Sequence, residues 1–144
     1  MNNPSIQFNF LEPFSLKDRN RLKRFLASLF KREKKALAEL QYILCSDPYL
    51  LEINRQFLHH DFYTDIITFD LADKDQPTQG EIYISVDRVR DNAGTFGSTI
   101  TQELHRVIFH GALHLCGYGD KTQKEEQEMR KMEEKYLLLY ERFT

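Results

Sequence analysis

The stretch TITQELHRVIFHGALHLCGYGD, residues 99–120, decides the fold that we expect for this chain. Thr99 and Gln102 form a capping box, in which two side chains bind the free backbone N–H groups at the start of a helix. Gly117 offers the left-handed backbone that ends a helix. The segment therefore predicts one amphipathic helix that runs to Cys116. Its core-facing stripe recurs at helical spacing: Ile100, Leu104, Val107, Ile108, Ala112 and Leu115.

Two segments upstream of this helix have the composition of β-strands. Residues 66–71 and 81–86 are rich in β-branched and aromatic side chains, which strands favour. The polar stretch 72–80 between them is expected to form a hairpin-like loop. Segments 38–45 and 6–11 are predicted as further strands. The sequence thus predicts a sheet of about four strands.

Helical segments flank these strands. Apolar residues in segment 22–29 follow helical spacing, and Ser15 and Asp18 precede them as a possible cap pair. The sequence Ser-Asp-Pro begins segment 46–57, which we expect to be a short helix with Pro in its first turn. A second capping box begins a helix over residues 122–140.

The expected order is a strand, a helix, a strand, a helix, two strands and three helices. Strands and helices mixed in this way predict an α+β fold, with a single mixed β-sheet covered by helices. No internal repeat or linker divides the chain, and 144 residues suit one domain. We therefore expect residues 1–144 to form a single domain.

The composition is that of a soluble globular protein. Hydrophobic residues make up 41% of the chain and charged residues 29%, which excludes disordered, collagen-like and disulfide-scaffold classes. No apolar run approaches the ~20 residues that span a membrane. The segment 1–10 lacks the features of a signal peptide, and Cys45 and Cys116 are far apart in sequence. We therefore expect a cytoplasmic protein with reduced thiols and no membrane partner.

The positive charge is concentrated in one segment. Between Lys17 and Lys35 nine Lys or Arg residues accompany only two acids, so this segment carries +7 while the whole chain carries -2. Such a block is what an anionic partner such as the RNA backbone selects. A solvated charged helix face has the same composition, and the sequence leaves both interpretations open.

Two histidines in the long predicted helix point to a metal site. His110 and His114 lie one turn apart on one helical face, so both imidazoles can reach a single ion. After the turn at Gly117, Asp120 can return as a third ligand and leave one coordination position for water, a catalytic pattern. This ligand set suits zinc, although iron, manganese or nickel accept it too. The alternative is a pair of surface histidines at the border of the apolar stripe.

The same stretch resembles the signature of the YbeY family, the metal-dependent endoribonucleases of ribosomal RNA maturation. Three upstream segments are similar to further motifs of this family: Glu52–Asn54, Thr64–Phe69 and Gly80–Ser85. The resemblance covers most of the chain from about residue 38 onward, and the ordered composite of motifs is specific. The signature residues that match are His110, Gly111, Leu113, His114, Leu115, Gly117 and Tyr118.

The resemblance implies a function. It implies a single-strand-specific metallo-endoribonuclease that acts in ribosomal RNA maturation, at the 3′ end of 16S rRNA, and in ribosome quality control. RNA and the ribosomal subunit are then the partners. The expected cofactor is one Zn²⁺ ion per chain, held by His110, His114 and Asp120 on a zincin-like metal-binding helix.

The chain departs from the family pattern at two places. Asp120 occupies the place of the usual third histidine, and a carboxylate there can still bind a divalent ion. Leu58 occupies the place of an arginine that serves RNA binding or catalysis, and Arg55, one helical turn earlier, is our candidate to replace it. Thr64 and Asp65 are candidate substrate-binding residues, with a cap that fixes the loop as the alternative.

Two other functions compete with the nuclease. A zinc protease shares the ligand spacing, but it needs a glutamate directly after the first histidine as general base, and that position is Gly111. An RNA-binding ribosome-assembly factor with a structural metal is the second alternative. A requirement of the intact metal site for RNA cleavage, rather than for RNA binding, distinguishes the nuclease from this factor.

Overall fold

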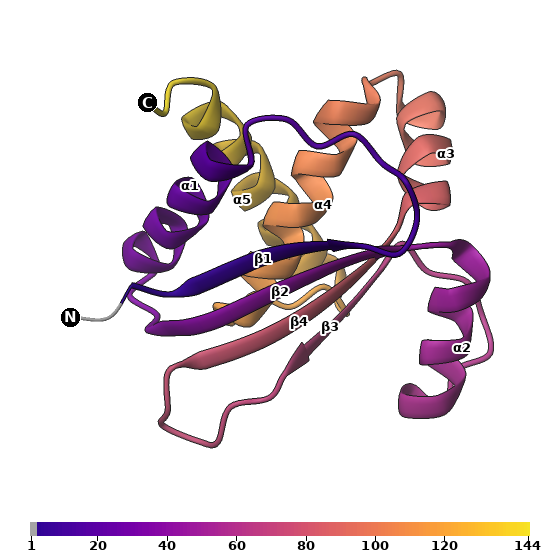
Figure 1. Ribbon diagram of the computed structural model, residues 1–144, viewed down its shortest axis with the longest axis horizontal. Helices are drawn as coiled ribbons and strands as arrows, with labels where there is room; N and C mark the ends of the chain where they lie inside the picture. The colour runs from indigo at the N-terminus through magenta and orange to yellow at the C-terminus, as the bar shows by residue number, and fades with distance from the viewer. Residues whose placement is uncertain (1–2) are drawn as a thin grey trace.

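The computed structural model describes residues 3–144 and contains one mixed four-stranded sheet (Figure 1). The strands lie in the order β1-β2-β4-β3. β1 (Ser5–Phe10), β2 (Leu37–Cys45) and β4 (Thr78–Ser85) are parallel, whereas β3 (Ile66–Asp70) pairs antiparallel with β4 and forms one edge. The predicted α+β fold with a single mixed sheet is confirmed.

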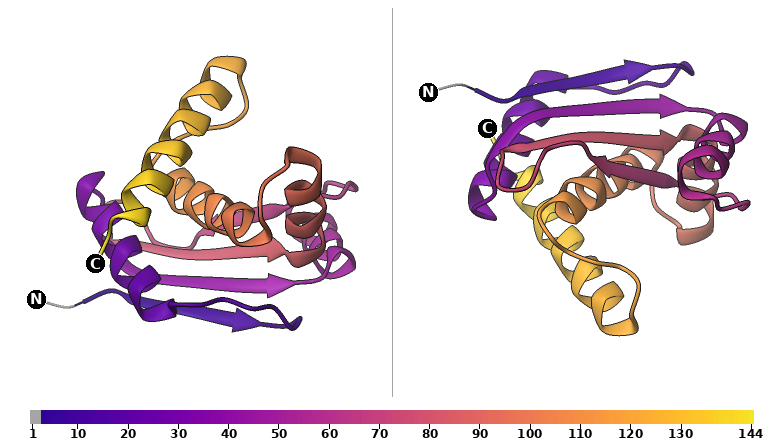
Figure 2. Two further views of the ribbon diagram at one scale, coloured as in Figure 1. Left: turned by 90° about the horizontal axis from the view of Figure 1, so that it is seen from above. Right: turned by 90° about the horizontal axis from the view of Figure 1, so that it is seen from below.

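Within residues 3–144, five helices accompany the sheet. Figures 1 and 2 show α1, α4 and α5 on one face and α2 near the other face, with α3 beside α4. The core between the first face and its helices is built mainly of leucine, isoleucine and aromatic side chains. The bounds are α1 (Arg19–Arg32), α2 (Asp47–Leu58), α3 (Val86–Phe96), α4 (Ile100–Leu115) and α5 (Gln123–Glu141).

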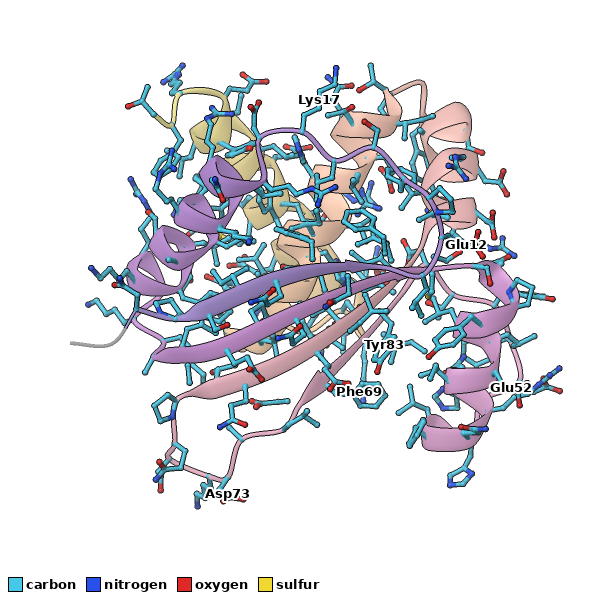
Figure 3. All side chains as sticks on the ribbon, viewed as in Figure 1. Glu12, Lys17, Glu52, Phe69, Asp73 and Tyr83 are labelled. Carbon is cyan, nitrogen blue, oxygen red and sulfur yellow. The ribbon has the colours of Figure 1, made fainter. Side chains whose placement is uncertain are left out.

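A smaller cluster lies on the opposite face. Leu50 of α2 packs there with Cys45 and Ile67, and Phe69 and Tyr83 pack against them. Figure 3 shows Phe69 and Tyr83 pointing to this side of the sheet, away from α4, and their rings meet edge to face at 5.9 Å. The short helix α2 is therefore anchored next to β3, which places the loop between them beside the sheet edge.

α4 lies directly on the sheet. The Tyr42 hydroxyl donates to the Ile108 carbonyl at 2.8 Å. A Cβ atom added at Gly111 would lie 2.9 Å from two atoms of Ile82 and 3.1 Å from Ile66, closer than carbon atoms pack. Gly111 is thus needed because the helix backbone approaches the strands too closely for a side chain.

Two local expectations were wrong. The fourth strand begins at Thr78, inside the stretch expected to be loop, because the Thr78 N–H donates to the Ala36 carbonyl at 2.8 Å. It ends at Ser85, whose side chain caps α3. The proposed cap pair of Ser15 and Asp18 does not form, since Asp18 is itself the N-cap with left-handed backbone (φ 56°) and makes no side-chain cap bond.

Candidate active site

A cavity of about 350 Å³ lies where α4, the edge strand β3 and the loop after α2 meet. His110, His114 and Asp120, the residues expected to bind metal, all line it. The remaining lining residues come from α2, its following loop, β3 and the loop after α4: Asn54, Leu58, His60, Phe62, Thr64, Ile66, Ile67, Thr68 and Lys121.

The His110 imidazole is held from both sides. Its Nδ1 lies 2.6 Å from the Glu133 Oε2 atom of α5, and its Nε2 lies 3.3 Å from the Asp120 Oδ2 atom. Because a carboxylate only accepts hydrogen bonds, Nδ1 carries the hydrogen that Glu133 receives. Nε2 is therefore the nitrogen that faces Asp120.

The His114 imidazole is fixed by the turn that ends α4. Gly117 adopts φ 110°, and the Tyr118 N–H returns to the Leu113 carbonyl at 3.1 Å. The Tyr118 carbonyl then lies 3.1 Å from His114 Nδ1, which donates to it. The expectation that Gly117 ends the helix is confirmed, and His114 also retains Nε2 for a ligand.

Imidazole nitrogens and a carboxylate oxygen are atoms that bind divalent ions. The structure places two of the three candidate donor atoms close together. Two ligands about 2.0–2.1 Å from a tetrahedral ion lie roughly 3.3 Å apart, the separation of His110 Nε2 and Asp120 Oδ2. Within residues 3–144, no group of three His, Cys, Asp or Glu side chains is arranged closely enough to hold an ion. His114 shares the cavity with the pair.

Charged groups behind His110 determine its electrostatics. Burial lowers the pKa of His110, but the hydrogen bond and the charge of Glu133, with the charges of Asp120 and Asp65, outweigh burial and raise it. Burial raises the pKa of Asp65, partly offset by the charge of Arg106. The carboxylates around His110 therefore favour positive charge on its imidazole.

The substrate-binding candidates Thr64 and Asp65 have different surroundings. Thr64 lines the cavity, and its hydroxyl donates to the Ile66 carbonyl at 3.4 Å. Asp65 turns toward α3 and α4, where its Oδ2 accepts from the Asn92 amide at 3.4 Å and lies 3.8 Å from Arg106. Thr64 thus combines a cavity position with the loop-fixing contact, whereas Asp65 joins the charged cluster behind His110.

Arg55, the candidate replacement for the family arginine, is exposed and paired with acids. Its Nε donates to Asp61 at 2.5 Å and its NH1 to Glu52 at 3.5 Å. Arg55 does not belong to the cavity lining, whereas Leu58 does. The role of Arg55 in RNA binding or catalysis therefore stays a prediction.

Sequence reasoning missed Glu133 and Lys121. Lys121 directly follows Asp120 and lines the same cavity. Glu133 occupies the buried stripe of α5 together with Met129, Tyr136 and Tyr140. A charged residue inside an apolar stripe is the signal that could have identified it, because an acid is rarely buried without a partner.

Comparisons with known proteins point to one family. A family model described as "Endoribonuclease YbeY" matches residues 12–141. A protein of that name from Cytophaga hutchinsonii is 51% identical over 126 residues, covering 88% of each chain. Another from Flavobacterium psychrophilum is 43% identical over 135 residues, covering 94% of this chain and 96% of its own.

A solved structure is similar as well. The solution structure of a Thermotoga maritima protein matches with a TM-score of 0.57 and 33% sequence identity, covering 91% of this chain and 87% of that one.

Within residues 3–144, this chain contains no helix whose length and apolar character would let it cross a membrane.

Proposed function

This chain belongs to the YbeY endoribonuclease family and is an endoribonuclease, and from that premise we propose that it cleaves single-stranded RNA with a divalent ion held by His110, His114 and Asp120. One observation carries the proposal. The three residues line one cavity, and His110 Nε2 and Asp120 Oδ2 stand 3.3 Å apart with the Nδ1 atoms of both histidines already hydrogen-bonded.

Zinc, one ion per chain, is the metal that we propose. Two imidazoles and one carboxylate form the ligand set of several catalytic zinc sites. A bound ion of this kind lowers the pKa of a coordinated water and polarises a phosphoryl oxygen. The protein residues supply the ligands and their orientation.

The side chains around the cavity suit an unpaired RNA strand. Lys121 contributes a positive charge that can bind a phosphate. Phe62 is 56% exposed, and its ring stacks with His60 at 5.0 Å. Exposed aromatic rings stack on unpaired bases, which a duplex keeps stacked inside itself. Phe62 and His60 therefore support a preference for single strands.

We propose ribosomal RNA as the substrate and the ribosomal subunit as the partner, in the cytoplasm. The basic segment 17–35 supports an extended RNA contact, because its last turn approaches the site: Glu33 accepts from the Tyr118 hydroxyl at 2.8 Å, and the Tyr118 carbonyl contacts His114. Lys34 and Lys35 follow Glu33 directly. A backbone that leaves the cavity in this direction meets positive charge.

The alternatives receive no support. A protease of the same ligand spacing needs a glutamate at position 111, where a Cβ atom would lie 2.9 Å from Ile82. The relatives that match are named endoribonucleases, which does not favour a non-catalytic assembly factor.

Cleavage of a labelled single-stranded RNA tests the proposal. The unchanged protein is compared with His110→Ala, with a chelator-treated sample restored with zinc, and with His59→Asn as a control. His59 caps α2 with left-handed backbone, which asparagine tolerates. We expect RNA cleavage by the unchanged protein, by the sample restored with zinc and by His59→Asn. We expect none by His110→Ala or by the chelator-treated sample before zinc is restored. Full activity of His110→Ala would overturn the assignment, and cleavage of casein without RNA cleavage would favour a protease.

A further inference from the structure

A chain of charged side chains runs behind His110. Arg106 of α4 donates to both Glu103 oxygens, from Nε at 2.9 Å and from NH2 at 2.5 Å. Its NH1 donates to Glu133 Oε1 at 3.0 Å. Glu133 Oε2 accepts from His110 Nδ1 at 2.6 Å. Four residues on two helices thus form one connected network that ends at the cavity.

Both acids of this network are buried. Glu103 is 2% and Glu133 3% exposed, and a buried carboxylate is costly unless it is paired and hydrogen-bonded. Buried ion pairs of this kind contribute little to stability compared with apolar residues of the same volume. Stability alone therefore gives no reason to keep an acid at position 133 in the apolar stripe of α5.

The direction of the hydrogen bonds gives such a reason. Glu133 uses one oxygen for Arg106 and the other for His110. The first contact holds the carboxylate in place, and the second fixes the ring orientation of His110. A carboxylate that accepts from one imidazole nitrogen makes the other nitrogen the ligand and increases its basicity.

We infer that Glu133 is a positioning residue that presents His110 Nε2 to the metal ion, and that Arg106 holds Glu133 in this role. The inference rests on the proposed metal site. His114 is supported differently, because its Nδ1 donates to the Tyr118 carbonyl rather than to a carboxylate. Loss of Glu133 should therefore affect metal binding through His110 alone.

Metal affinity without turnover is the direct test. Zinc binding is measured by competition with a chromophoric chelator for the unchanged protein, Glu133→Gln and Glu134→Gln. Glutamine keeps the size and one acceptor oxygen but removes the charge. We expect affinity about 10- to 100-fold weaker for Glu133→Gln and unchanged for the exposed neighbour Glu134→Gln. Circular dichroism confirms that each variant folds.

The results separate this inference from the proposed function. If Glu133→Gln binds zinc like the unchanged protein while His110→Ala does not, the positioning role is wrong and the metal site stands. If His110→Ala also binds zinc normally, the metal site itself is wrong.

A second measurement needs no variant. Nitrogen-15 NMR of the zinc-loaded protein should show His110 coordinated through Nε2, with hydrogen on Nδ1. Coordination through Nδ1 would overturn the inference even if Glu133→Gln failed to fold.

Discussion

The Tyr118 hydroxyl donates to Glu33 Oε1 at 2.8 Å, which ties the turn after α4 to the end of α1. Tyr136 of α5 donates to the other oxygen of the same carboxylate. Since the Tyr118 carbonyl accepts from His114, the placement of this imidazole depends on Glu33, which caps the end of α1, and on Tyr136 of α5. Each of the two histidines that we propose as metal ligands therefore has its own supporting contact.

Tyr118→Phe should weaken this support. It removes the hydroxyl but keeps the carbonyl that faces His114, so we expect zinc affinity to fall by a few-fold while binding persists. The free energy of unfolding should drop by about 1 kcal/mol, the net value of one hydrogen bond. Urea unfolding and chelator competition measure the two effects. Tyr49→Phe, at an exposed position, is the control, and equal effects in both variants would contradict the prediction.

Asp120→His should retain zinc, because it places an imidazole where the carboxylate stands 3.3 Å from His110 Nε2. Asp120→Ala should lose affinity, since one of three protein ligands disappears. Emission spectrometry of the purified proteins measures the metal content. The same metal content in the unchanged protein, Asp120→His and Asp120→Ala would show that position 120 does not contact the ion.

Gly111→Ala should destabilise the protein by about 1–3 kcal/mol, the usual effect of overpacking, because the new Cβ meets Ile82 at 2.9 Å. Gly94→Ala is a matched control in helix α3, where a Cβ has no neighbour within 4 Å. It should stabilise by about 0.5–1 kcal/mol, as alanine does in a helix. Urea unfolding of both variants is the measurement, and changes of the same sign would refute the close approach of α4 to the sheet.

We expect the free energy of unfolding to fall on acidification because of His105. Burial, reinforced by the charge of Arg21, lowers the pKa of its imidazole in the folded state. The unfolded chain takes up the proton near pH 6.5, so this contribution is complete above that pH and is lost as the pH falls toward the lower folded pKa. His105→Phe keeps the ring contacts with Phe109 and Tyr140. Urea unfolding between pH 8 and pH 5 should show a flatter dependence for the variant, and an unchanged slope would disprove the prediction.

Phe62→Ala should raise the KM for single-stranded RNA with little change in kcat. A lost stacking contact costs about 1–3 kcal/mol of binding, which corresponds to roughly 5- to 150-fold in KM. Phe57→Ala is the control, because this exposed ring packs edge to face on Phe69 and does not line the cavity. Zinc content should stay constant in both variants, and equal KM values for the two would exclude Phe62 as a stacking surface.

Local signals in the sequence were sufficient for much of the fold. The capping box at Thr99 forms as expected, because both of its partners lie within one helical turn. The start of the fourth strand was missed because Thr78 pairs with Ala36, 42 residues earlier. Such a pairing leaves no trace in a short window of sequence.

The same difference between local and long-range contacts applies to the candidate site. The spacing of His110, His114 and Asp120 predicted that they would bind one metal ion, and all three line one cavity. Their role as ligands stays a prediction. Glu133 lies 23 residues from its partner His110, and only the packing of α5 on α4 brings them together. The pairing of Asp65 with Arg106 also depends on tertiary packing.

The close contact at Gly111 limits which side chains position 111 can accept. A glutamate at that position would press on Ile82 and Ile66, and the same helix carries His110 and His114, so the change would also disturb two of the proposed metal ligands. Smaller residues at Ile82 and Ile66 would relieve the contact, each with its own loss of packing. The tight packing of α4 against β3 and β4 therefore disfavours a glutamate base beside His110 on this scaffold.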